Sequence, residues 1–192
     1  EWAEHVARLH TASADHRGPL VDPQFELFVW QTLAAMWRLP GSRLAPLTKE
    51  RLTGYLEKGM REAKVHTAWV DGNEEYEREV LDFALWALES SQVREILDEW
   101  TTLTFDSQRT AILGQKLIQL TIPGVPDVYQ GNETLDLSLV DPDNRRTVDH
   151  DAHASRLEAL LAGETPEGIA DEKLLLVHSA LEVRRDHKEA FV

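Results

Sequence analysis

The stretch from 121 to 149 holds the side chains best suited to chemistry, because the helical patterning of the rest of the chain stops there. A short β-prone run, 125–129, ends in Tyr129 and is followed at once by Gln130 and then by Glu133. Parallel sheets place their ligand chemistry at the carboxyl ends of strands. We therefore predict that these three side chains bind a polar ligand. A plain strand-end turn, in which Glu133 forms a cap or an ion pair, is an equally open alternative.

A charged loop follows, in which Asp141, Asp143, Asn144, Arg145 and Arg146 stand close together. Such a cluster offers enough donors and acceptors to bind several hydroxyl groups. The Asp-Pro-Asp-Asn run is also a favourable turn, and the two arginines can bridge to the acids. We expect part of the cluster to bind ligand and part to be scaffold. We also expect Asp143 to be solvent-accessible, so that its substitution changes stability by no more than about 0.5 kcal/mol.

A third group of candidates, Lys64, His66, Trp69 and Tyr76, lies around the end of a predicted helix. Aromatic faces suit the apolar side of a sugar ring, while Lys and His suit its hydroxyl groups. The alternative is a capped helix terminus with core aromatics, and the pattern alone does not separate the two.

Asp149, His150, Asp151 and His153 have a spacing that offers metal ligands. An acidic first turn of a helix is common and favourable without any metal, however. Since the sequence shows no closed set of ligands, we predict no metal and no cofactor.

The chain is acidic, with 34 Asp and Glu against 20 Lys and Arg and a formal net charge of −14. This balance argues against nucleic acid and anionic membranes as partners, since both need basic patches. There are no cysteines, which excludes disulfides and thiol chemistry. No uninterrupted apolar run is long enough for a membrane span. The chain starts at Glu1 rather than Met and stops abruptly at Val192, so we expect a segment of a longer protein.

Helical periodicity dominates on both sides of the central stretch, so the predicted fold class is mainly α with one short strand. Asp22-Pro23 and Asn73 are helix-start signals, and a break is expected at Ser90-Ser91. Asp106 or Ser107 is expected to cap a further, separate helix. The remaining helices are expected over 2–10, from about 48, over 74–90, over 150–161 and over 171–187.

The central stretch also carries a resemblance to a known family. Gly124, Pro126, Tyr129, Gly131 and Glu133 match, position by position, the eighth-strand pattern Gly-x-Pro-x-x-Tyr-x-Gly-x-Glu of the α-amylase family. The run that follows, LDLSLVDPDNRRTVD, narrows the resemblance to the maltooligosyl trehalose synthases. Further matches extend it over essentially the whole chain: Glu1-Trp2, Arg61 to Lys64, His66-Thr67, Trp69, Asn73, Tyr76-Glu77 and Arg184 to His187. The departures are Gly72, Thr134-Leu135 and Thr147, and loss of an aromatic residue near a sugar site would weaken stacking.

The resemblance implies a cytoplasmic isomerase that rearranges the terminal α-1,4 bond of a maltooligosaccharide into the α,α-1,1 bond of trehalose. It implies a helical subdomain over 1–104 and, over 105–192, the last strand and helices of a (β/α)8 barrel. Such retaining chemistry needs a nucleophilic carboxylate and an acid/base carboxyl about 5–5.5 Å apart. In this family those groups lie on strands four, five and seven, whose motifs are absent here. We therefore predict no catalytic residue in this chain, an inactive isolated segment, and the rest of the barrel as its partner.

By resemblance, the chain would hold the maltooligosaccharide substrate through ten side chains. Two alternatives stay open: a stand-alone maltooligosaccharide-binding helical module, and an acidic helical interaction domain without catalysis. The ten predicted substrate-binding residues are Lys64, His66, Trp69, Tyr129, Gln130, Glu133, Asp141, Asp143, Asn144 and Arg145.

Overall fold

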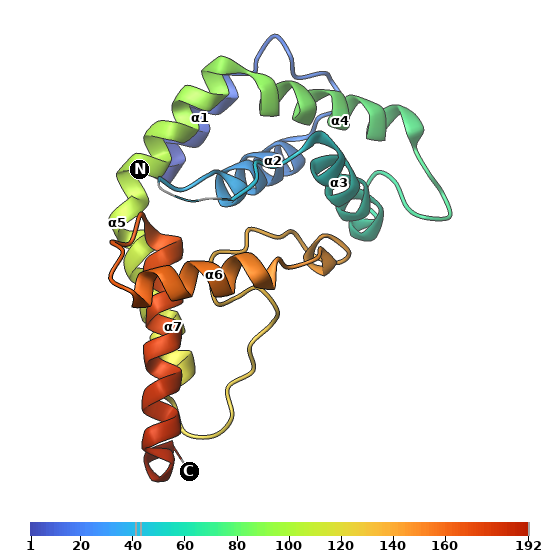
Figure 1. The fold of residues 1–192 in the computed structure, drawn as a ribbon. Helices are drawn as coiled ribbons and strands as arrows, with labels where there is room; N and C mark the ends of the chain where they lie inside the picture. Colours follow the sequence, from blue (N-terminus) through green and yellow to red (C-terminus); the bar gives the residue numbers. More distant parts are fainter. Residues whose placement is uncertain (41, 43, 192) are drawn as a thin grey trace. The chain divides into compact units, whose positions relative to one another are not determined.

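The computed structural model describes residues 1–40, 42 and 44–191, and the regular elements of this part are helices (Figure 1). The mainly α fold class is thus confirmed for the described residues, which contain no β-strand. None of their helices is both long enough and apolar enough to cross a membrane. In chain order the elements are α1 (Trp2–Ala12), α2 (Pro23–Met36), α3 (Lys49–Ala63), α4 (Glu74–Glu89), α5 (Ser91–Thr121), η1 (Asp143–Arg145), α6 (His150–Leu161), α7 (Ile169–Asp186) and η2 (Lys188–Phe191).

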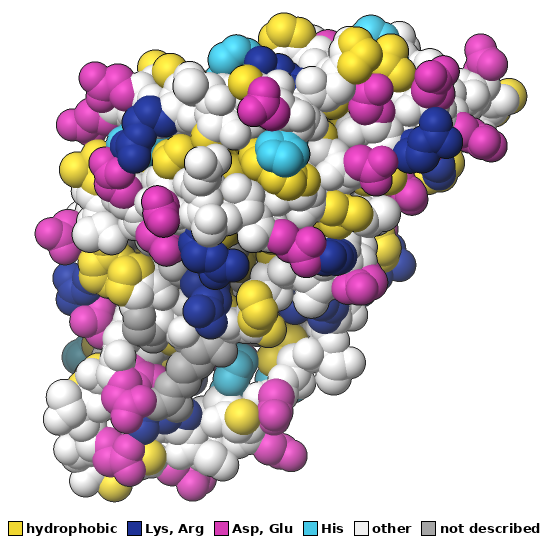
Figure 2. All heavy atoms as spheres, turned by 90° about the horizontal axis from the view of Figure 1, so that it is seen from above, with side chains coloured by type: hydrophobic (Ala, Val, Ile, Leu, Met, Phe, Trp, Pro, Cys, Tyr) yellow, Lys and Arg dark blue, Asp and Glu magenta, His cyan; other side chains and the backbone are white. Residues whose placement is uncertain are grey.

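The chain divides into two compact units, which we describe separately. The first unit comprises 1–37, 45–103 and 138–145, so it contains α1 to α4, the start of α5 and the charged loop with η1. The second unit comprises 38–44, 104–137 and 146–192. The division into functional domains at residue 104 stays a prediction. Acidic side chains are scattered among Lys and Arg on the face seen in Figure 2.

Side-chain caps fix where the helices of the first unit begin. Asp22 accepts hydrogen bonds from the backbone N–H groups of Gln24 and Phe25, both at 3.0 Å, and so caps α2. Asn73 caps α4 through Tyr76, at 3.2 Å. Both predicted starts are confirmed. Asp22 thus pairs two donors of the first turn and Asn73 pairs one, and such a cap stabilises a helix by about 1 kcal/mol.

The core of the first unit forms where the apolar faces of these helices meet. Trp30 and Phe83 are its largest fully buried side chains, with ring centroids 5.3 Å apart in an edge-to-face arrangement. Truncating such a side chain to Ala costs about 3–5 kcal/mol. The other fully buried core members include Leu9, Val29, Leu33, Leu52, Leu56, Val80, Ala84, Ala87, Val93 and Leu97.

α5 corrects one expectation. Its separation from α4 at Ser90 is confirmed, but the predicted new start at Asp106 or Ser107 is wrong, since α5 is continuous from Ser91 to Thr121. The backbone carbonyl of Asp106 accepts a hydrogen bond from the hydroxyl of Thr110 at 2.8 Å, one turn on. A residue type that often caps helices is only weak evidence for a helix start, and here the turns on both sides are helical.

The second unit relies on polar links more than on a large core. Arg156 of α6 donates to both carboxylate oxygens of Asp171 near the start of α7, at 2.5–3.1 Å. Arg184 of α7 donates to the carbonyls of Leu120 and Ile122, at 2.9 Å each, at the end of α5. The run 125–129 is irregular, and within the described residues it pairs with no strand.

Candidate functional site

The turn over 129–134, called the strand-tip turn because it follows the run predicted as a strand, carries three of the predicted site residues of the second unit. Gly131 shapes this turn: its φ is +79°, and a β-carbon there would lie 3.1 Å from a methyl group of Val148. A side chain is therefore disfavoured by both backbone conformation and space. Tyr129 is half exposed, while the side-chain amide of Gln130 donates to the carbonyl of Arg146 at 3.3 Å. Tyr129 is thus available to a ligand.

Glu133, the third residue, is held by two histidines of α6. Nδ1 of His153 lies 2.8 Å from Oε1 of Glu133, and Nδ1 of His150 lies 3.7 Å from the same oxygen. Burial raises the pKa of Glu133, but the hydrogen bond from His153, its own backbone N–H and the two nearby imidazoles together lower it below the ordinary value. Glu133 is therefore an anion held in place, and its side chain is only 25% exposed.

A polar cavity of about 550 Å³ lies beside this turn, lined by Tyr129 and Asn132 and by two buried lysines, Lys116 and Lys173. Nζ of Lys173 donates to the carbonyl of Thr134 at 2.6 Å. Burial, with a smaller contribution from Lys116, lowers the pKa of Lys173 to about 8. Neither lysine is recognisable as a site residue from the sequence, because each sits within an ordinary helical pattern. The remaining lining residues are Ile112, Gln115, Gln119 and Asp127.

The charged loop as far as Arg145 belongs to the first unit, where Asp143 anchors it, and Arg146 belongs to the second. Nε and Nη2 of Arg51, on α3, donate to the two oxygens of Asp143 at 2.8 Å each, and the N–H of Leu139 donates to it at 2.7 Å. The Asp143 side chain is only 11% exposed, so the expectation of a solvent-accessible carboxylate is wrong. The reason is the fork of Arg51, which lies 92 residues away and is not visible as a partner in the sequence.

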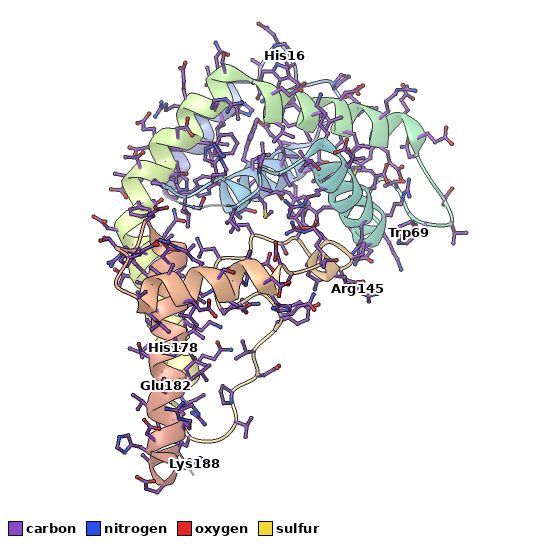
Figure 3. The ribbon with its side chains drawn as sticks, viewed as in Figure 1. His16, Trp69, Arg145, His178, Glu182 and Lys188 are labelled. Carbon is purple, nitrogen blue, oxygen red and sulfur yellow. The ribbon has the colours of Figure 1, made fainter. Side chains whose placement is uncertain are left out.

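The rest of the loop is less firmly held. Lys58 donates to the carbonyl of Asp141 at 2.7 Å, and the carboxylate of Asp141 forms an ion pair with Arg145. Arg145 projects from η1 at the surface, with 71% of its side chain exposed (Figure 3). Oδ1 of Asn144 is buried without a hydrogen-bond partner among the described residues. Arg145 and Asn144 thus keep hydrogen-bonding capacity that Asp143 has already used.

The helix-end group lies around a left-handed residue that ends α3. Lys64 adopts φ 55° and ψ 32° and is exposed. Trp69 is 60% exposed, projects from the loop after α3, and has the guanidinium of Arg61 5.0 Å from its ring centroid (Figure 3). His66 lies with Nε2 3.5 Å from a carboxylate oxygen of Asp22. The three predicted residues share one surface loop of the first unit.

His66 also borders a cavity of about 190 Å³ whose walls are largely aromatic and aliphatic. Its ring centroid is 4.8 Å from that of Tyr76, whose hydroxyl donates to Asp22 at 3.0 Å. Burial raises the pKa of Tyr76 well above its ordinary value, so the hydroxyl stays protonated. Phe25 and Phe28 complete the wall.

The predicted site residues therefore fall into two sets. The binding roles of both sets stay predictions. The second unit holds Tyr129, Gln130 and Glu133, and the first unit holds Lys64, His66, Trp69, Asp141, Asp143, Asn144 and Arg145.

Comparison with known proteins gives one consistent result, although no family model matches the chain. A protein of Mycobacterium tuberculosis named maltooligosyl trehalose synthase is 36% identical over 191 residues, which is 100% of this chain and 23% of that protein. The solved maltooligosyltrehalose synthase of Arthrobacter ramosus is 36% identical, with a TM-score of 0.84 over 97% of this chain and 24% of that one. A hypothetical maltooligosyl trehalose synthase of Sulfolobus tokodaii is 27% identical, with a TM-score of 0.79, covering 100% of this chain and 25% of that one.

These comparisons confirm the resemblance recognised in the sequence over the whole chain. They also set its extent, since the chain spans about a quarter of the length of the curated relatives it matches.

Proposed function

We propose that this chain is a segment of a cytoplasmic maltooligosyl trehalose synthase, the isomerase that converts the terminal α-1,4 linkage of a maltooligosaccharide into the α,α-1,1 linkage of trehalose. One observation carries the proposal: the full length of the chain matches such enzymes at 36% identity, with the same fold. The segment has the size and the helical fold of one quarter of a larger enzyme, not of a whole one.

In this proposal the strand-tip turn contributes binding, not bond cleavage. A retaining mechanism needs one carboxyl group that can donate a proton and one that can attack. Glu133 suits neither role, because its hydrogen bond from His153 and the two imidazoles keep it ionised and fixed. It suits the task of accepting hydrogen bonds from sugar hydroxyls. Tyr129, half exposed beside the polar cavity, is placed to stack on or hydrogen-bond to the ring.

The first unit would contribute its surface loop and its charged loop. Trp69 has an exposed aromatic face, and Lys64, His66 and Arg145 have exposed cationic or polar groups. Asp143 would act indirectly, since both of its oxygens are bonded to Arg51 and its effect on substrate would come through the position of Asn144 and Arg145.

The rest of the barrel is the proposed partner. Several apolar side chains near the end of α5 and in the irregular run after it are exposed, among them Ile118 at 62% and Val125 at 98%. Exposed apolar side chains gathered in one region favour a covering partner over solvent.

The test is a segment exchange. The corresponding quarter of the Arthrobacter ramosus enzyme is replaced by residues 1–192, and the product is incubated with maltopentaose. We expect a non-reducing maltooligosyl trehalose to form, detected as loss of reducing ends without loss of total glucose. A folded exchange enzyme that only hydrolyses maltopentaose, or leaves it unchanged, would contradict the proposal.

A binding measurement separates the proposal from its alternatives. A stand-alone maltooligosaccharide-binding module would bind maltopentaose tightly by itself, and would not restore activity to the exchange enzyme. An acidic interaction domain would do neither. The proposed segment restores activity, whatever its own affinity for the sugar.

A further inference from the structure

Glu133, which the proposed function assigns to sugar binding, also forms a cluster with His150 and His153. One ligand-type atom from each residue lies within 4.8 Å of the other two. Glu133 comes from the strand-tip turn, and the two histidines lie three residues apart in the first turn of α6. Residues three apart share one face of a helix, so both imidazoles are presented to the same carboxylate. All three residues belong to the second unit.

The donor set is one that Zn²⁺ and similar divalent metals prefer. Two imidazole nitrogens with one carboxylate oxygen are a known catalytic zinc set, in which the fourth position is left to water or another ligand. Both histidines present the same atom, since it is Nδ1 of each ring that lies nearest to Oε1 of Glu133, at 2.8 Å and 3.7 Å. Zinc lies about 2.0–2.2 Å from such ligand atoms. The side chain of His150 is 69% exposed and so is free to turn toward an ion, which would also separate His153 from Glu133.

A supporting contact holds one ligand in place. The second ring nitrogen of His153, Nε2, lies 3.4 Å from the hydroxyl of Thr134. Metal-binding histidines almost always have such a partner on the other nitrogen, which fixes the tautomer and the ring orientation. The N-cap bond from Ala152 to Asp149, at 2.9 Å, fixes the turn of α6 that carries both rings.

The site is also reachable. A cavity of about 260 Å³ is lined by Thr134, Ala152 and His153, and this open side leaves room for a water molecule on the metal. Two kinds of charge act on a cation at this site. Lys116 and Lys173, which interact with Glu133, repel it, whereas the net charge of −14 on the whole chain attracts it. Glu133 is only partly exposed, which limits competition from bulk water for its oxygen.

We propose that Glu133, His150 and His153 bind one divalent transition-metal ion of the Zn²⁺ type, which ties the strand-tip turn to α6. The ion replaces the hydrogen bond between His153 and Glu133 and takes Nδ1 of both histidines and one oxygen of Glu133 as ligands. The sequence-level alternative, in which Asp149 and Asp151 also serve as ligands, is not part of this site. The proposal shares Glu133 with the proposed function, but its test uses metal ions alone, so that failure of one is distinguishable from failure of the other.

The experiment is a titration of the chain with Co²⁺, which replaces Zn²⁺ and reports its coordination by visible absorption. We expect one equivalent to give the intense spectrum of a four- or five-coordinate ion, and excess Zn²⁺ to abolish it. Zn²⁺ at a hundredfold excess over its dissociation constant should raise the melting temperature by about 5–10 °C. A weak octahedral spectrum would overturn the proposal.

Variants make the assignment specific. His150→Ala and Glu133→Gln should each weaken Co²⁺ binding by at least about 100-fold, and Thr134→Val by about 10-fold. His187→Ala, an exposed histidine of the same unit, is the matched control and should bind as the parent does. His150 has no role in the core, so His150→Ala should fold normally by circular dichroism. Equal binding by His150→Ala and the parent would overturn the site.

Discussion

A single arginine decides what the charged loop can do. Arg51 occupies both oxygens of Asp143 in a fork-to-fork pair whose side chains are 14% and 11% exposed. Charge-assisted, bidentate pairs are the strong ones, and partial burial reduces solvent screening. The carboxylate that looked best placed to bind a sugar is therefore a structural anchor, and its neighbours are the better binding candidates.

We predict that Asp143→Ala destabilises the first unit by about 1.5–3 kcal/mol, because it removes a charged hydrogen-bond partner and leaves the guanidinium of Arg51 poorly paired. Urea unfolding of the isolated chain measures this. Arg145→Ala is the control: its side chain is 71% exposed, so the change should stay within about 0.5 kcal/mol. A double-mutant cycle with Arg51→Ala should show coupling of at least about 1 kcal/mol; additive effects would mean that the pair contributes nothing.

Lys173 gives a prediction with a defined direction in pH. Its pKa falls to about 8 in the folded chain, first through burial and then through Lys116, while Asp136 and Glu133 oppose the fall. The ordinary pKa of a lysine is 10.5. Between pH 8 and pH 10.5, Lys173 therefore holds a proton in the unfolded chain that it has released in the folded chain. Lys173 therefore makes the free energy of unfolding increase as the pH rises through this window.

The measurement compares the parent with Lys173→Met at pH 7.5 and pH 10. Between these values the parent should gain about 1–2 kcal/mol relative to the variant, since titration of all other groups cancels in the difference. A constant difference would show that Lys173 is not desolvated in the folded chain.

At the scale of elements, the structure separates residues that cap a helix from residues that only have capping side chains. Asn73 has a side chain bonded to the backbone of the first turn of α4, at 3.2 Å. Ser107 is exposed within α5, and its neighbours continue the helix on both sides. The two residues were expected to play the same role, and only Asn73 does.

We expect opposite effects from the same substitution at these two positions. Asn73→Ala should destabilise the chain by about 1 kcal/mol, because an N-cap bond is lost. Ser107→Ala should be neutral or stabilise it by up to about 0.5 kcal/mol, because alanine is the better helix former. Thermal unfolding of both variants checks the pair. A loss of about 1 kcal/mol in Ser107→Ala would indicate a helix start at that position after all.

Sequence reasoning succeeded where the signal is local and failed where it depends on distant partners. Asp22, Asn73 and the break at Ser90 announce helix ends through chemistry with near neighbours, and these were predicted. Arg51 pairs with a residue 92 positions away, and Lys173 bonds a carbonyl 39 positions away. The apolar periodicity of their helices is the same with or without those partners, so this periodicity does not predict the contacts.

The motif residues occupy an intermediate position. The spacing from Tyr129 to Glu133 marked the strand-tip turn, and the structure adds that Glu133 is held by His153. The run 125–129 has β-prone residues, yet the described residues give it no strand to pair with. A strand needs a hydrogen-bonding neighbour as much as it needs propensity. The relatives that this chain matches are about four times longer, which leaves room for such a neighbour.

At the scale of the whole molecule, the chain spans about a quarter of the length of the curated relatives it matches. The chain has a well-packed first core and a polar, cavity-bearing second unit. The residues predicted to bind substrate are divided between the two units. Chemistry of the retaining type needs two carboxyl groups about 5–5.5 Å apart with different protonation states. Glu133 is paired with His153 and Asp143 with Arg51, so neither of these two carboxylates is suited to those roles.

We therefore predict that the isolated chain forms no detectable trehalose-type product from maltopentaose. Binding groups without a nucleophile and a proton donor lower no barrier to breaking the glycosidic bond, whose cleavage in enzymes of this kind proceeds at about 1–1000 per second. Purified chain at high concentration is incubated with maltopentaose, and non-reducing product is assayed beside the Arthrobacter ramosus enzyme as a positive control. Glu133→Gln serves as the matched variant. Turnover in that range by the chain, abolished in Glu133→Gln, would make Glu133 a catalytic residue and would reverse the binding role proposed for it.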